Sequence, residues 1–76
     1  MSYKEARELA ALPTEITALE SEQRDLTAKM CRPDYFRQGA EQMQIDRGRA
    51  VDIETQLSKR LQRWEVLEAQ AGESAG

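Results

Sequence analysis

The chain has 76 residues, a formal net charge of -3 and a charged fraction of 33%, but only 5% of its residues are aromatic. A core built from so short a chain stabilises a fold by only about 3–5 kcal/mol unless its packing is idealised. This composition argues against a compact enzyme and is typical of long helices that keep most of their side chains in water.

The first predicted element is a helix over about residues 3–31. Ser2 stands three residues before Glu5, a spacing at which each side chain accepts a hydrogen bond from the other residue's backbone N–H. A helix is therefore expected to begin at Tyr3. Its apolar positions follow one another in alternating steps of three and four, with Gln23 filling the one gap, and are Leu9, Leu12, Ile16, Leu19, Leu26 and Met30. That spacing is a heptad seam.

Three residues interrupt the helical pattern. Pro13 has no backbone donor, so we expect a kink or a restart of the helix there. Pro33 and Gly39 end the period and predict a connection over about residues 32–39. Asp34 stands where it could cap a short helical turn within this connection.

The second predicted arm covers about residues 40–70, which would make it roughly 45 Å long at 1.5 Å per residue. Its apolar positions again follow helical spacing, and they are Met43, Ala50, Ile53, Leu57, Leu61, Trp64 and Leu67. The closing residues 71–76 are small and polar, and we expect them to form a disordered tail.

The two seams agree on a single register. In an antiparallel hairpin that turns near Phe36, the numbers of facing residues should add up to about 73. This pairs Leu12 with Leu61 and Ile16 with Leu57. The sequence therefore predicts an all-α fold, a two-helix antiparallel coiled-coil hairpin that is expected to be monomeric.

The residues needed for common catalytic and metal sites are missing from the sequence. It contains no histidine and one cysteine, so it can assemble neither a zinc site nor a histidine-assisted nucleophile. Its four glycines are too widely spaced for a phosphate-binding loop. Its carboxylates have helix-surface spacing, which provides no pocket to raise a pKa. We expect a non-catalytic domain that holds no cofactor or metal.

Cysteine content and hydropathy suggest the compartment. Cys31 is alone, which fits a reducing cytoplasm better than a secreted disulfide framework. No apolar run approaches the ~20 residues that cross a bilayer, so we expect a cytoplasmic protein without a membrane partner. Cys31 lies near Lys29 and Arg32, cations that would favour a redox sensor, but a small apolar filler at the end of the hairpin is the preferred interpretation.

Three aromatic residues each have two interpretations. Trp64 could stack on nucleobases, but its place in the seam favours a core position against Leu9 and Tyr3. Tyr35 and Phe36 belong to the connection, where they could either cover the open end of the seam or contact a partner. The covering position is preferred for both.

Charge is distributed unevenly along the chain. Residues 24–49 hold six cations and four anions, whereas the remainder holds five cations and ten anions. The cations could form i,i+4 pairs on a solvated face, such as Glu20 with Arg24 and Asp25 with Lys29. They could instead form an arginine-rich tip that contacts phosphate backbones. The candidate nucleic-acid contacts are Arg24, Lys29, Arg32, Arg37, Arg47 and Arg49.

Three segments carry a family resemblance: SYKEARELAALP at residues 2–13, PDYFRQ at 33–38 and RWEVLE at 63–68. Together they resemble the C-terminal coiled-coil domain of the Uup-type ABC-F ATPases, which is the ABC transporter C-terminal domain family. Those proteins are soluble bacterial ATPases with two tandem ATP-binding cassettes and no transmembrane part. The resemblance covers about residues 2–70.

The resemblance implies a coiled-coil hairpin with an atypical helical stretch in its turn, appended after the second cassette of a longer protein. It also implies DNA binding by this domain, with ribosomal RNA as a further partner, while ATP and Mg²⁺ belong to the parent cassettes. Phosphate contacts of this kind would not read base sequence. The alternative is a docking arm that acts on the parent cassettes or the ribosome, and a plain structural spacer is a third possibility.

Overall fold

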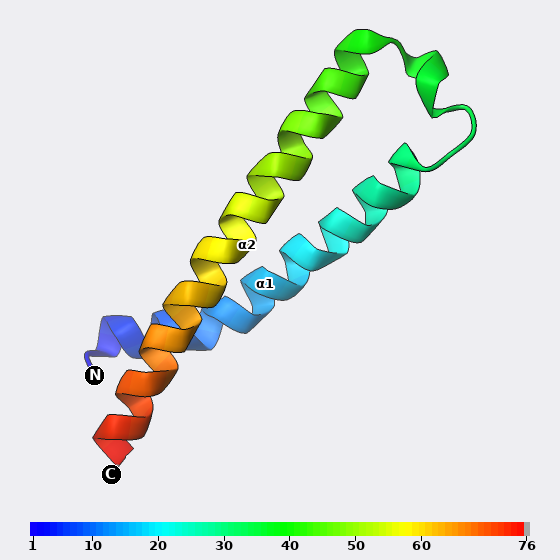
Figure 1. Cartoon of the computed structure of the whole chain (residues 1–76). Helices are drawn as coiled ribbons and strands as arrows, with labels where there is room; N and C mark the ends of the chain where they lie inside the picture. The colour runs from blue at the N-terminus through cyan, green and yellow to red at the C-terminus, as the bar shows by residue number, and fades with distance from the viewer. Residues whose placement is uncertain (76) are drawn as a thin grey trace.

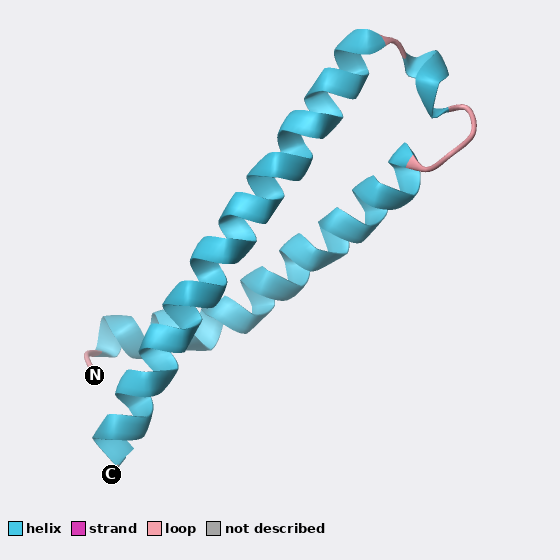
Figure 2. Ribbon diagram, viewed as in Figure 1, coloured by secondary structure: helices cyan, strands magenta, loops and turns pink. Residues whose placement is uncertain are grey.

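The computed structural model describes the backbone of residues 1–75 and the side chains of residues 1–72; Gly76 lies outside the described residues. Its elements are α1 (Tyr3–Met30), a 3-10 helix η1 (Tyr35–Gln38) and α2 (Ala40–Ala75). α1 and α2 run in opposite directions, with the connection at one end and both termini at the other (Figure 1). Figure 2 shows helices joined by short loops over the described residues. The predicted all-α antiparallel hairpin is confirmed.

α1 begins where the sequence predicts. The Glu5 backbone N–H donates to Ser2 Oγ at 3.1 Å, and the Ser2 backbone N–H donates to Glu5 Oε1 at 3.4 Å. Pro13 lies inside α1, which continues through it to Met30. The helix bends within its first half (Figure 1), so the structure has a kink and not a restart.

The connection is folded by its own backbone. The Arg37 N–H donates to the Asp34 carbonyl at 3.0 Å, which closes the four-residue turn of η1. Asp34 precedes η1 but its side chain makes no capping hydrogen bond, so the predicted side-chain cap is wrong. Gly39 has φ 93°, a left-handed conformation that favours glycine, and it lets the chain reverse into α2 at Ala40.

α2 extends beyond the arm that the sequence predicts. The sequence predicts an arm that ends at about Gln70 and a disordered tail over residues 71–76; the helix continues to Ala75, and Gly76 lies outside the described residues. Alanine and glutamate are strong helix formers, and one glycine, Gly72, costs only about 1 kcal/mol relative to alanine. The composition of this segment therefore permits the helix to continue.

The core lies in the predicted seam and confirms the register. Ile53 is fully buried and forms a cluster with Leu19 and Leu57, against which Ile16 and Leu26 pack. In the four ion pairs that cross between the helices, the residue numbers add up to 71 or 75, on either side of the predicted 73. The pairs are Lys29–Asp46, Arg49–Glu22, Arg60–Glu15 and Arg63–Glu8.

One predicted core position is wrong. Leu61 remains 47% exposed, although its predicted partner Leu12 is buried. Two successive steps of four residues from Ile53 turn about 80° beyond two full helical turns, so Leu61 falls beside the seam. Arg60 takes the half-buried position instead. Trp64 is half-buried, as a seam position requires, but Tyr3 is exposed and does not complete the core.

Candidate nucleic-acid interface at the tip of the hairpin

The connected end of the hairpin, residues 24–49, is called the tip below. Its centre is Asp46, whose carboxylate is buried, with the residue 5% exposed. Asp46 accepts hydrogen bonds from the Tyr35 hydroxyl at 3.0 Å, from Gln42 Nε2 at 3.1 Å and from Lys29 Nζ at 3.3 Å. Since these donors come from η1, α2 and α1, one carboxylate ties all three elements together.

The electrostatics of Asp46 reflect two opposing effects. Burial favours the neutral acid and so raises its pKa, but the hydrogen bonds from Tyr35, Gln42 and Lys29 together hold the pKa below its ordinary value. Asp46 is therefore an ionised, fully partnered structural group. Burial of the Tyr35 phenol raises the pKa of Tyr35, and its hydrogen bond to the Asp46 carboxylate raises that pKa further.

Lys29 is consequently not a free cation. Its ammonium lies 3.2 Å from Asp46 Oδ2 across the hairpin, so the predicted i,i+4 pair with Asp25 is not formed. The predicted pair of Glu20 with Arg24 is also not found among the described side chains.

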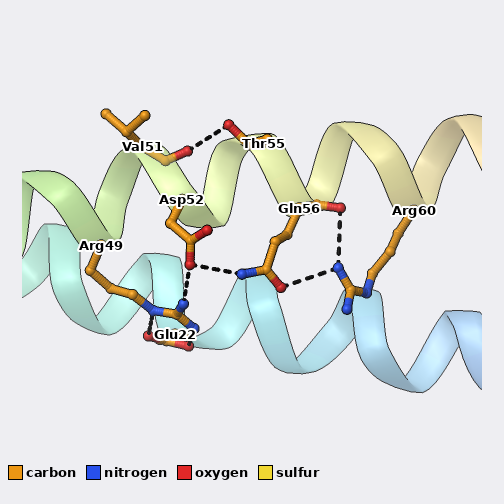
Figure 3. Close-up of polar contacts among 7 residues, drawn as sticks. All are labelled: Glu22, Arg49, Val51, Asp52, Thr55, Gln56 and Arg60. Atoms are coloured by element: carbon orange, nitrogen blue, oxygen red, sulfur yellow. Dashed lines mark hydrogen bonds and ion pairs between the residues drawn. The ribbon is translucent and has the colours of Figure 1, made fainter.

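Arg49 is likewise held within the hairpin (Figure 3). Its guanidinium donates to both carboxylate oxygens of Glu22, with Nη2 at 2.6 Å from Oε1, and it also contacts Asp52. Asp52 accepts from Gln56 at 2.8 Å, and Arg60 in turn donates to Gln56 Oε1 at 3.2 Å. The bond to Arg49 lowers the pKa of Glu22. Arg49 therefore helps to fix the register of α2 against α1.

The pairs that follow Arg49–Glu22 toward the termini form a ladder. Arg63 donates to both oxygens of Glu8, at 2.8 and 3.0 Å, and Arg60 lies 3.7 Å from Glu15. Glu8, Glu15 and Glu22 are seven residues apart, which places them on one side of α1. The seven-residue spacing of these glutamates is visible in the sequence, but the apolar seam alone does not predict the ion pairs.

Four of the six predicted site residues remain exposed and, within the described side chains, belong to no ion pair: Arg24, Arg32, Arg37 and Arg47. Arg32 and Arg37 lie in the connection. Arg24 and Arg47 each stand two residues from a member of the Glu22–Arg49 pair, which is about 200° of helical turn. Both therefore lie on the side of the hairpin opposite the ladder.

The two aromatic residues of the connection point in different directions. Tyr35 is 4% exposed and covers the end of the seam, as predicted, whereas Phe36 is 74% exposed, so the covering position predicted for it is wrong. Their rings meet edge to face, with centroids 6.1 Å apart and planes at 69°. Cys31 is exposed at the end of α1, so the apolar filler predicted there is also wrong.

A depression of about 540 Å³ lies at the tip, lined by Asp25, Ala28, Lys29, Arg32, Asp34 and Gln38. Two carboxylates offset its two cations, so it has no net positive charge to attract a phosphate. In residues 1–72 no group of acidic or cysteine side chains is arranged to hold a metal ion. None of the helices within the described residues is long and apolar enough to span a membrane.

Comparison with known proteins shows the family. Residues 1–69 match the family described as ABC transporter C-terminal domain. The chain belongs to this family. It is 35% identical over 68 residues to a protein of Haemophilus influenzae strain Rd named ATP-binding protein Uup-like. That alignment covers 90% of the chain but 15% of the relative's length. No solved structure matches the chain.

Membership confirms the resemblance read from the sequence. An ABC transporter C-terminal domain is an accessory part of an ATP-binding protein and not a catalytic one, in agreement with the expected lack of enzymatic activity. The chain spans about 15% of the length of this relative.

Proposed function

We propose that this ABC transporter C-terminal domain binds nucleic acid, with DNA as its first partner, through phosphate contacts that do not read the base sequence. The single observation that supports this is a set of four arginines at the tip that are exposed and form no ion pair with the side chains of residues 1–72: Arg24, Arg32, Arg37 and Arg47. Arginine presents a planar group of donors that matches phosphate oxygens. Cassettes elsewhere in the parent protein would bind ATP and Mg²⁺.

The internal ion pairs narrow the predicted contact set. Lys29 and Arg49 would have to abandon Asp46 and Glu22 to reach a phosphate, and leaving those carboxylates without their partners would cost free energy. Lys29 and Arg49 instead stabilise the tip through these ion pairs between the two helices. Outside residues 24–49, the chain holds twice as many anions as cations, so a phosphate backbone repels that end and the tip approaches first.

The test is the salt dependence of binding. A triple variant, Arg32→Gln, Arg37→Gln and Arg47→Gln, removes three phosphate contacts, each of which contributes about 0.9 to the slope of log affinity against log salt for duplex DNA. We expect the slope to fall by about 3 and affinity at low salt to drop at least tenfold. Fluorescence anisotropy with a labelled duplex at four salt concentrations measures both quantities.

A matched control removes the same charge from outside the tip. Lys4, Arg7 and Lys59 are exposed and unpaired among the described side chains, and changing all three to glutamine alters the net charge equally. The control should bind nearly as the parent domain does. If both triple variants lose the same affinity, the tip has no special part in binding and the proposal is wrong.

A docking arm is the second candidate, and exposed apolar side chains favour it. Ile45 and Val51 on α2 are each more than half exposed, as a protein contact would require. In this case the tip triple variant would leave nucleic-acid binding unchanged but alter ATP hydrolysis by the longer protein. Ribosomal RNA would engage the same arginines as DNA, and a parallel titration with an RNA duplex compares the two.

A further inference from the structure

Phe36 is an apolar ring surrounded by charge. It belongs to η1, is 74% exposed, and is flanked in the connection by the exposed residues Arg32 and Arg37. Exposing a large aromatic side chain to water brings no stability, because the ring gains nothing from the core. Its neighbour Tyr35 already covers the seam, so the fold does not need Phe36 for that purpose.

The position of Phe36 is fixed by contacts of its neighbours. The adjacent Tyr35 is anchored in the hairpin by its hydroxyl, which donates to the buried Asp46, and its ring holds an edge-to-face contact with Phe36. Backbone hydrogen bonds from Tyr35 to Arg32 and from Arg37 to Asp34 fix the turn itself. A ring that is held in place before binding loses little conformational freedom when a partner arrives.

We propose that Phe36 is a stacking platform for an unpaired nucleobase, so that the tip prefers single-stranded segments to uninterrupted duplex. The proposal rests on the proposed function above and names the form of nucleic acid that its site takes. Stacking on an aromatic ring needs a base whose face is open, and in a continuous duplex those faces are covered by neighbouring pairs. The flanking arginines would hold the phosphates on either side of the stacked base.

The surroundings favour a base over an apolar pocket on a protein. A protein contact centred on Phe36 would gain from other exposed apolar residues beside it, whereas the remainder of the connection is polar, charged or small apart from the covered Tyr35. A nucleobase needs only one flat ring together with positive charge for its phosphates. That combination is what residues 32–37 present.

The experiment compares two forms of the same nucleic acid with three variants of the whole 76-residue chain. Affinities for a twelve-nucleotide DNA strand and for the corresponding blunt duplex are measured for the parent domain, Phe36→Leu and Phe36→Trp. Stacking contributes about 1–3 kcal/mol per base, which is roughly 5- to 150-fold in affinity. We expect Phe36→Leu to lose at least fivefold for the strand and less than twofold for the duplex, while Phe36→Trp keeps the strand affinity.

Two controls isolate the ring. Tyr3 is an equally exposed aromatic residue at the opposite end of the hairpin, and Tyr3→Leu should change neither affinity. A strand in which one base at a time is replaced by an abasic spacer keeps every phosphate, and at one position it should weaken the parent domain but not Phe36→Leu. The same strand as RNA shows whether the sugar matters. Melting curves confirm that the variants fold equally well.

The outcomes separate this inference from the proposed function. If no form of nucleic acid binds the parent domain, both fail. If the tip arginines prove necessary but Phe36→Leu leaves strand affinity intact, or weakens strand and duplex equally, the stacking inference is overturned and phosphate binding stands. Loss of strand affinity alone, rescued by tryptophan, establishes the platform.

Discussion

Asp46 shows how much a single residue can decide in so small a fold. Its carboxylate receives a lysine, a phenol and an amide from three different elements. Removing it would leave the buried Tyr35 hydroxyl and the partly exposed Lys29 ammonium without their acceptor, and a buried polar group without a partner costs free energy. It also holds the turn in which the proposed contacts lie.

We expect Asp46→Ala to lower the melting temperature by about 4–8 °C or more, because one lost kcal/mol has that effect in a domain of this size. Asp25→Ala is the matched control, since Asp25 is exposed and has no ion pair within the described side chains, and its melting temperature should stay within about 2 °C of the parent. Circular dichroism at 222 nm follows both transitions. Equal stability of the two variants would contradict the central place of Asp46.

Between the two long helices, the ladder of ion pairs sets the register together with the seam. Each exposed pair contributes little by itself, because solvent screens it. A charge reversal acts more strongly, since it replaces attraction by repulsion at a fixed position. Arg49→Glu would place a carboxylate opposite Glu22 and beside Asp52.

We expect Arg49→Glu and Glu22→Arg each to lower the melting temperature by several degrees, and the double exchange to recover at least half of the loss. Such recovery is the mark of direct coupling between two side chains. The measurement is a double-mutant cycle of melting temperatures at low salt. Additive losses would mean that Glu22 and Arg49 do not interact in solution.

At this scale the sequence predicts the fold well and the polar details poorly. Two apolar stripes of matching length suffice to give both helices and a register near 73, because burial of the stripes dominates the energetics. The core position predicted for Leu61 is wrong because two successive steps of four residues from Ile53 drift away from the heptad. Asp46 could not be recognised as buried, because acidic residues are buried only when they are paired, and its partners come from three separate segments.

The candidate site was predictable only as a region. The positions of charged residues in the sequence place six cations within residues 24–49, but they do not show which of these cations form ion pairs within the fold. Lys29 and Arg49 are held by acidic partners 17 and 27 residues away, contacts that only the folded register reveals. The divergent directions of Tyr35 and Phe36 likewise depend on how η1 sits on the arms.

For the whole molecule, three carboxyls predict that the fold loses stability in acid. Hydrogen bonds from Arg63 and Arg49 lower the pKa of Glu8 and Glu22, and the donors around Asp46 outweigh its burial and lower its pKa as well. A carboxyl whose folded-state pKa lies below its unfolded value stabilises the fold fully above the unfolded value, and that stabilisation disappears as pH falls through the folded one.

We therefore expect the melting temperature to be constant between about pH 6 and 8 and to fall progressively below about pH 5. Melting curves recorded by circular dichroism at unit steps from pH 8 to pH 3 test this. Glu8→Gln combined with Glu22→Gln should flatten the acid limb of the profile. A parent domain whose melting temperature rises on acidification would show that these carboxyls gain nothing from folding.

The hairpin measures 56 × 16 × 15 Å, and the first residues of α1 and the last described residues of α2 lie at the end opposite the connection (Figure 1). At 3.4 Å per step, that length matches about 16 base pairs of B-form DNA. Any body attached at either chain end is thus kept more than one and a half helical turns away from whatever the far pole touches. The lengths of α1 and α2 therefore set the distance between the chain ends and the tip.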